Sequence, residues 1–164
     1  MSRRRESMTM LVLILLAACL LTILPLPGWL APLWPYWVGL VMIYWVLELP
    51  DMTGLGMAFV VGLFLDILTA SLMGLNALSL VILVYLVQRF RARLRFFPAW
   101  QQALSVLALL INDQVIRLWV AWLVGEPFPD WRYWLSPLVG MTLWPWVFLL
   151  LDRIRAGRRR ARQA

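Results

Sequence analysis

Long blocks of apolar residues, separated by short breaks rich in proline and glycine, run through almost the whole chain. Clear breaks lie at Pro25–Gly28, Leu49–Asp51 and Gly125–Pro129, and proline and glycine are the residues at which helical hydrogen bonding usually ends. A helix that spans a bilayer needs about 20 mainly apolar residues. The pattern therefore predicts about six transmembrane helices, at Met8–Pro25, Leu33–Leu49, Gly54–Leu72, Leu75–Gln88, Gln101–Val124 and Tyr133–Leu151.

The composition agrees with this pattern. Apolar residues make up 63% of the 164 residues, compared with about 45 to 50% in ordinary soluble domains. No polar segment is long enough to fold as a separate soluble domain. We therefore expect an all-α, polytopic integral membrane protein, in which residues 1–164 form a single transmembrane domain with short basic ends.

The positive charges indicate how these helices are oriented. All 15 are arginines, against 8 acidic residues, and they cluster at the ends of the apolar blocks. Short loops rich in arginine stay in the cytoplasm. Six spans with a cytoplasmic N-terminus place every arginine except Arg117 and Arg132 on that side, whereas five spans would separate the basic clusters. We therefore predict a multi-pass protein of the bacterial inner membrane with both termini in the cytoplasm. The cytoplasmic arginines are then Arg3, Arg4, Arg5, Arg89, Arg91, Arg93, Arg95, Arg153, Arg155, Arg158, Arg159, Arg160 and Arg162.

The two ends of the chain carry further signals. Leu16–Cys19 resembles the processing site of a bacterial lipoprotein, but the chain stays apolar through Leu26 instead of turning polar. We favour an uncleaved first helix, with processing at Cys19 as the alternative. The arginine-rich tail after Leu151 is expected to anchor the chain at the bilayer surface, where it can contact anionic lipid.

Most of the tryptophans fall near the side of the membrane opposite to the arginines. Tryptophan prefers the membrane interface, so the simpler interpretation is an aromatic belt. The alternative is a surface for a partner protein, because tryptophan is a common anchor of protein interfaces. The residues concerned are Trp29, Trp34, Trp37, Trp119, Trp122, Trp131 and Trp134.

The chain has no histidine and one cysteine. This composition excludes a disulfide framework, a histidine relay for protons, and metal sites built from histidine or several cysteines. Glu126 and Asp130 come nearest to a catalytic pair, but a solvated turn with Pro127 and Pro129 explains them. A nucleic-acid partner would require a soluble basic face. We therefore expect no catalytic residue, no metal, no cofactor and no nucleic-acid partner, and hence no enzyme.

Three ionisable residues lie deep inside predicted spans, where charges are costly and usually functional. Asp66 and Asp113 lie about 18 Å from the cytoplasmic ends of their helices and Arg117 about 24 Å, at about 1.5 Å per residue, so the three residues could share one layer of the bundle. Asp113 and Arg117 are spaced i, i+4 with the acid first, the favourable order for an ion pair on one helix. We favour the interpretation that this pair neutralises itself.

Asp66 has no such local partner. It follows Gly62 by four residues and precedes Gly74 and Asn76, and small residues allow a neighbouring helix to approach closely. We expect Asp66 to act as a polar anchor of helix packing. A role as a proton or ion carrier is the alternative, but a relay would need further acids or histidines.

Four groups of residues resemble, in their order and spacing, the rod-shape-determining MreD family of Gram-negative bacteria. They are Tyr44–Leu47 with Leu49–Pro50, Gly62–Asp66 with Gly74, Trp100–Leu104, and Leu143–Trp146. The resemblance covers most of the chain, from about Pro35 to Arg155. Asp66 and the glycines around it match the family's motif. Relatives often carry a glycine shortly after the aspartate, where this chain has Ala70, which leaves open how tightly the helices pack there.

The resemblance implies a non-enzymatic subunit of the cell-elongation complex. Its partners would be MreC, the glycosyltransferase RodA and the elongation-specific penicillin-binding protein, with the actin-like MreB as a further candidate. The family is similar in fold to the substrate-binding subunits of energy-coupling-factor transporters. The leading hypothesis is thus a membrane scaffold that binds MreC and positions wall synthesis. The alternative is a transporter subunit for a small solute or vitamin, with Asp66, Asp113 and Arg117 lining its pocket.

Overall fold

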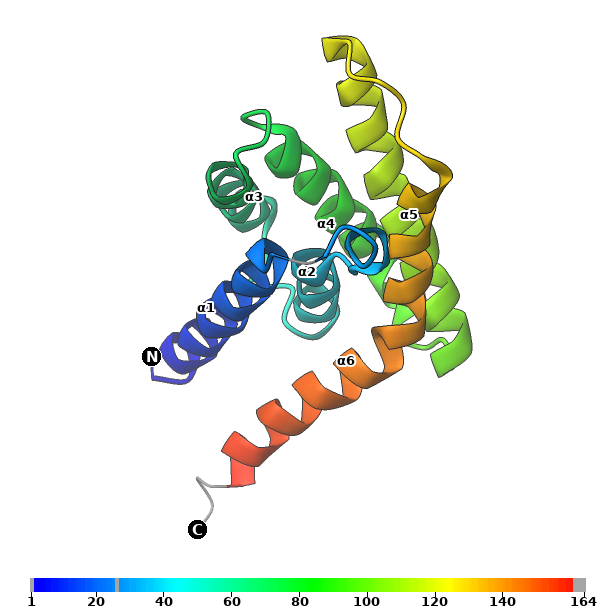
Figure 1. Ribbon diagram of the computed structural model, residues 1–164. Helices are drawn as coiled ribbons and strands as arrows, with labels where there is room; N and C mark the ends of the chain where they lie inside the picture. Colours follow the sequence, from blue (N-terminus) through cyan, green and yellow to red (C-terminus); the bar gives the residue numbers. More distant parts are fainter. Residues whose placement is uncertain (1, 26, 161–164) are drawn as a thin grey trace.

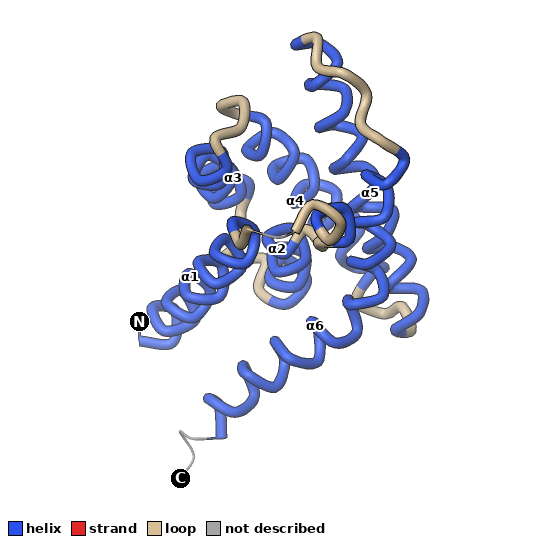
Figure 2. Tube along the Cα trace, viewed as in Figure 1, coloured by secondary structure: helices blue, strands red, loops and turns tan. Residues whose placement is uncertain are grey.

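The computed structural model describes residues 2–25 and 27–160, with side chains from Met8 to Gly157 except at position 26. This part of the chain is entirely helical and contains no strand (Figure 1). Figure 2 shows that short loops join the helices. The all-α expectation is therefore confirmed. The α-helices are α1 (Ser2–Ile23), α2 (Trp37–Glu48), α3 (Leu55–Thr69), α4 (Leu75–Leu94), α5 (Ala99–Val124) and α6 (Leu135–Arg160), with 3-10 turns η1 (Ala31–Leu33) and η2 (Trp131–Trp134).

Helix α2 forms the centre of the bundle. Every residue from Val38 to Leu47 is buried, and α1, α4 and α6 all pack against it, so that it is seen end-on in the middle of Figure 1. A helix that is apolar on all faces is expected to be buried on all faces. At about 1.5 Å per residue its 12 residues extend about 18 Å. The predicted span Leu33–Leu49 therefore consists of the end of η1, an extended connection and this short core helix.

Hydrogen bonds between distant segments define two ends of the bundle. At one end, Trp34 donates through its indole nitrogen to the Leu21 carbonyl (2.9 Å), and Ser136 donates to the Trp34 carbonyl (2.8 Å). At the other, Arg91 donates to the Leu47 carbonyl (2.9 Å). We name these the Trp34 end and the Arg91 end. Consecutive helices alternate between them, and the start of α1 and the end of α6 lie on the same side of the bundle in Figure 1.

Within the described residues, three helical segments are long and apolar enough to cross a membrane: Leu75–Leu94, Ala99–Val124 and Trp131–Gly157. The apolar helices Met8–Ile23 and Leu55–Thr69 are shorter. Each of the six predicted segments contains one α-helix, while the number of spans stays a prediction. Helix α4 continues past its predicted end at Gln88 to Leu94, since arginine is a good helix former and its side chains there reach the surface.

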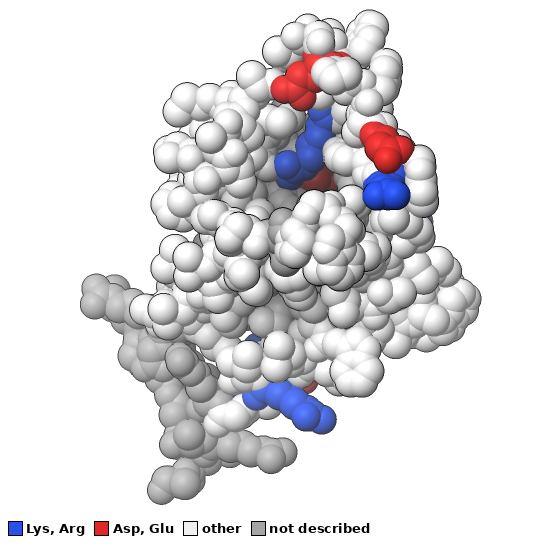
Figure 3. All heavy atoms as spheres, in the orientation of Figure 1, with Lys and Arg blue, Asp and Glu red and all other residues white. Residues whose placement is uncertain are grey.

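Large apolar side chains also cover the outside of the bundle, as expected where lipid replaces water as the solvent. On α3, α5 and α6, Ile67, Trp119 and Trp146 have exposed fractions of 67%, 59% and 73%. The face in Figure 3 is correspondingly uncharged over most of its area. An interior and an exterior that are both apolar define an integral membrane protein.

Candidate functional site

The carboxylate of Asp66 is enclosed by the turn that joins α3 to α4. Its Oδ1 accepts hydrogen bonds from the Ser71 hydroxyl (2.9 Å), the Asn76 backbone N–H (2.8 Å) and the Asn76 side-chain amide (2.9 Å). Its Oδ2 accepts one from the Gly74 N–H (2.8 Å). Free N–H groups and the helix dipole make the first turn of α4 favourable for a carboxylate. Asp66, which is 2% exposed, therefore fastens α3 to the start of α4.

The backbone of this turn is left-handed at two positions. Gly74 has φ +98°, and Ala70, which ends α3, has φ +48°. Glycine adopts this region at little cost, whereas a Cβ makes it unfavourable. The alanine at position 70 therefore occupies a conformation that suits glycine. The packing question that the sequence left open at Ala70 thus concerns the backbone of the turn.

Helix packing itself is tight at Gly62. A Cβ added to Gly62 would lie 2.3 Å from Cα and 2.6 Å from the backbone nitrogen of Ala77 on α4. The two backbones are thus in direct contact, which only glycine permits. Gly62 and Asp66 face the same partner helix from adjacent turns of α3, so close packing and the polar anchor act on the same pair of helices.

Arg117 joins α5 to this cluster. Its Nε donates to Asp113 Oδ2 at 2.7 Å on the same helix, and its Nη1 donates to the Asn76 side-chain oxygen on α4. The guanidinium also lies over the ring of Tyr36, 4.6 Å from its centroid, in a cation–π contact. We call Asp66, Ser71, Asn76, Asp113 and Arg117 the Asp66–Arg117 network.

Sequence reasoning selected the three charged members of this network and missed Asn76 as the link between them. Asn76 gives its amide N–H to Asp66 and its oxygen to Arg117. The available signal was an amide side chain two residues after Gly74, in the first turn of a predicted helix. Tyr36 had no usable signal, because it precedes α2 and meets Arg117 only in the folded chain.

The network keeps spare hydrogen-bonding capacity. Among the described side chains, Asp113 Oδ1 and Arg117 Nη2 are buried without a hydrogen-bond partner, whereas most buried polar atoms in proteins have one. Figure 3 shows basic and acidic atoms together inside a hollow between α4 and α5. The Arg117 side chain is 21% exposed and that of Asp113 2%.

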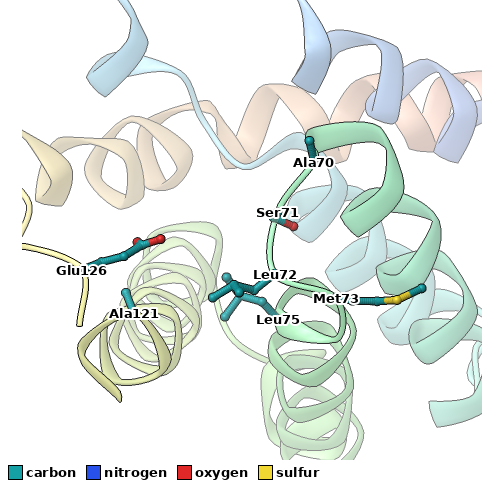
Figure 4. A pocket seen from close by; sticks show the side chains of 7 residues that line it. All are labelled: Ala70, Ser71, Leu72, Met73, Leu75, Ala121 and Glu126. Carbon is teal, nitrogen blue, oxygen red and sulfur yellow. The ribbon is translucent and has the colours of Figure 1, made fainter. Parts of the chain in front are cut away.

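A pocket of about 510 Å³ opens between the α3–α4 turn and the end of α5. Ser71, Leu72 and Leu75 lie on one side, with Glu126 and Ala121 across from them (Figure 4). Its size is within the range of sites for small molecules, about 300 to 1,000 Å³. The pocket and the network share Ser71, so they belong to one region of the fold.

Other motif residues meet near the Arg91 end. The Trp144 indole donates to Gln102 Oε1 (3.1 Å), which ties α6 to α5. Tyr44 on α2 packs edge-on against Phe148, with ring centroids 5.4 Å apart. Arg155 is paired with Glu48, connecting the end of α6 to the end of α2.

The predicted basic ends are only partly described. The side chains of Arg3, Arg4, Arg5, Arg158, Arg159, Arg160 and Arg162 lie outside the described residues. Cys19, the candidate processing site, is buried within α1. Five tryptophans predicted for one interface have exposed side chains; they are Trp29, Trp119, Trp122, Trp131 and Trp134.

An apolar helical bundle with a polar network buried among α3, α4 and α5 defines a helical membrane protein. The family model described as rod shape-determining protein MreD matches residues 2–154. The rod shape-determining protein MreD of Haemophilus influenzae is 33% identical over 138 residues, covering 84% of this chain and 85% of that protein. The chain belongs to the MreD family, whose name refers to the determination of rod shape. No solved structure matches it significantly.

Proposed function

We propose that the protein is a non-enzymatic scaffold subunit of the rod-shape complex in the bacterial inner membrane, which binds MreC and helps to position peptidoglycan synthesis. Membership of the MreD family supports a role in cell shape. The observation that carries the scaffold mechanism is the Asp66–Arg117 network, since it ties three helices together at fixed positions. A scaffold needs such rigidity, because a preformed surface costs less entropy to bind.

The outer face of α3 offers a surface for a partner helix. Val60, Phe64 and Ile67 lie on one helical stripe, with exposed fractions of 65%, 44% and 67%. One turn earlier, a Cβ added to Gly56 would have no neighbouring atom within 4 Å, so a second backbone can approach closely there. Membrane helices associate through such combinations of small and apolar residues. We propose that an apolar helix of MreC packs on this stripe, while Gly62 and Asp66 hold the opposite face of α3 against α4.

The proposal includes the topology. Six crossings with both termini in the cytoplasm would place the Arg91 end on the cytoplasmic side. The α4–α5 turn would then lie on the cytoplasmic side, where MreB is the further candidate partner. The Trp34 end would face the periplasm. On that side the protein would position RodA and the elongation-specific penicillin-binding protein for wall synthesis.

Affinity purification from mild detergent tests the scaffold at matched membrane abundance. MreC is expected to come down with the wild-type protein and to be lost with Gly56→Phe, which fills open space on the stripe without touching the core. Asp66→Asn should reduce recovery as well, because it disrupts the anchor that orients α3. Leu149→Phe, on the exposed face of α6, and Asp152→Asn, an exposed acid near the Arg91 end, serve as matched controls.

Absence of every wall-synthesis protein from the wild-type sample would contradict the scaffold. In that case the transporter alternative leads, and the pocket beside the network favours it, because Glu126 and Ser71 line a space of suitable size. Mass spectrometry of the purified protein would then be expected to find a retained small molecule, which Asp66→Asn should release.

A further inference from the structure

Three arginines around the α4–α5 turn have no partner among the described residues. Arg89, Arg93 and Arg95 are exposed, and the ion pairs of the described chain involve Arg117, Arg132 and Arg155 instead. Arg91, between them, differs because it donates to the Leu47 carbonyl and holds the end of α2. The nearby acids do not neutralise the three arginines, since Glu48 is paired with Arg155 and the exposed Asp51 and Asp152 form no ion pair with them.

Aromatic side chains stand next to these charges. Phe96 and Trp100 have exposed fractions of 87% and 65%, and Phe90 45%. Phenylalanine and tryptophan insert into the boundary between headgroups and acyl chains, and tryptophan prefers that depth. The turn therefore combines free guanidinium groups with side chains suited to the membrane interface.

The turn is held in shape by its own hydrogen bonds. The N–H groups of Arg95 and Phe96 donate to the carbonyls of Arg91 (3.1 Å) and Arg93 (3.1 Å). The Gln102 side chain donates to the Leu94 carbonyl (3.3 Å) and so ties the start of α5 to the end of α4. The backbone that carries the charges and the aromatic rings is thus ordered before a ligand binds, which reduces the entropy lost on binding.

From this arrangement we propose that Arg89, Arg93, Arg95, Phe96 and Trp100 form a binding site for the phosphate headgroup of an anionic phospholipid. Guanidinium groups bind phosphate oxygens with paired hydrogen bonds, while the two aromatic rings enter the interface beside the lipid. Charge complementarity decides in favour of an anionic lipid, because a zwitterionic headgroup offers a competing positive charge to the same arginines. Each arginine near an anionic surface strengthens binding about fivefold, so the three together supply on the order of 100-fold.

Purified full-length protein in mild detergent provides the test. It is titrated with phosphatidylglycerol or phosphatidylcholine of identical acyl chains, and bound lipid is counted by native mass spectrometry. Phosphatidylglycerol is expected to bind on the order of 100-fold more tightly. The triple variant Arg89→Gln/Arg93→Gln/Arg95→Gln should lose this preference, whereas Arg132→Gln, at the opposite end, should keep it.

A triple Gln variant that retains the full preference for phosphatidylglycerol would overturn the site, as would equal binding of the two lipids by the wild type. Inorganic phosphate that competes at the same concentration as phosphatidylglycerol would also overturn it, by showing a site for free phosphate. If the triple variant does not fold, Arg93→Gln alone should weaken binding about fivefold. The triple substitution to lysine should keep only part of the preference, since the charges remain but the paired hydrogen bonds of the guanidinium groups are lost.

Discussion

Asn76 is the residue through which opposite charges on two helices act together. Its side chain donates to Asp66 and accepts from Arg117, so removing it deprives both charged groups of a buried partner. A hydrogen bond to a charged group contributes about 1.5 to 3 kcal/mol, and leaving a charged group unsatisfied in the interior costs at least as much. At the scale of single residues, the stability of the fold therefore depends strongly on one neutral amide, which its position in the sequence does not reveal.

We predict that Asn76→Ala lowers the free energy of unfolding by about 3 kcal/mol, because it removes bonds to two charged groups at once. The measurement is thermal unfolding in detergent, followed by the loss of monodisperse protein. Asn112→Ala is the matched control, since the Asn112 side-chain nitrogen is buried without a hydrogen-bond partner among the described residues, so its removal is expected to be neutral or slightly stabilising. Equal effects of the two variants would show that the link does not stabilise the fold.

A substitution at position 70 should raise the stability of the fold instead of lowering it. Ala70→Gly is predicted to stabilise the protein by about 0.5 to 1 kcal/mol, because it relieves a left-handed alanine at φ +48° and loses part of the gain to the greater freedom of glycine in the unfolded chain. The same substitution at Ala92, inside α4 and exposed, should destabilise by about 1 kcal/mol. Thermal unfolding of both variants decides this, and a lower unfolding temperature for Ala70→Gly would contradict the strain.

At the scale of helices, α3 and α4 are the most closely packed pair of the bundle. Gly62 brings their backbones into contact, and Asp66 closes the turn between them one helical turn later. Packed backbones cannot yield as a flexible side chain can, so a single methyl group there acts on the whole helix pair.

Gly62→Ala is therefore predicted to destabilise by about 3 kcal/mol, near the upper range of effects of overpacking, even though alanine is the better helix former. Gly56→Ala on the same helix meets open space and should be neutral or stabilising by up to about 1 kcal/mol. Comparing the unfolding temperatures of the two variants separates packing from helix propensity. Similar values would mean that α3 can move away from α4 without cost.

At the scale of the whole molecule, the alternation of the helices makes topology testable. Phe128, 71% exposed, lies between α5 and η2, and Arg93 lies near the Arg91 end. In a background that carries Cys19→Ala, a membrane-impermeant maleimide should label Phe128→Cys in cells whose outer membrane is permeable. It should label Arg93→Cys only after the inner membrane is opened. Labelling of Arg93→Cys in intact spheroplasts would rule out a cytoplasmic Arg91 end.

The helices and the Asp113–Arg117 pair could be predicted from sequence because both depend on residues close together in the chain. Runs of apolar residues specify helices in a medium without water, and an i, i+4 pair is adjacent on any helix. Gly62, Asp66 and Gly74 were also identifiable, from small residues beside a lone acid. The end of α4 was predicted too early, at Gln88 instead of Leu94, because arginines close a hydrophobic segment without ending a helix.

Sequence by itself thus determined the class of protein, the six helical segments and the charged residues of the network. Only the tertiary structure decided that α2 occupies the centre, that Asn76 joins Asp66 to Arg117, and that Tyr36 lies beneath the guanidinium. The physical reason is that lipid tails are as apolar as a protein core, so hydropathy does not distinguish a helix that faces lipid from one that faces other helices. Contacts between residues far apart in the chain arise only when the helices pack.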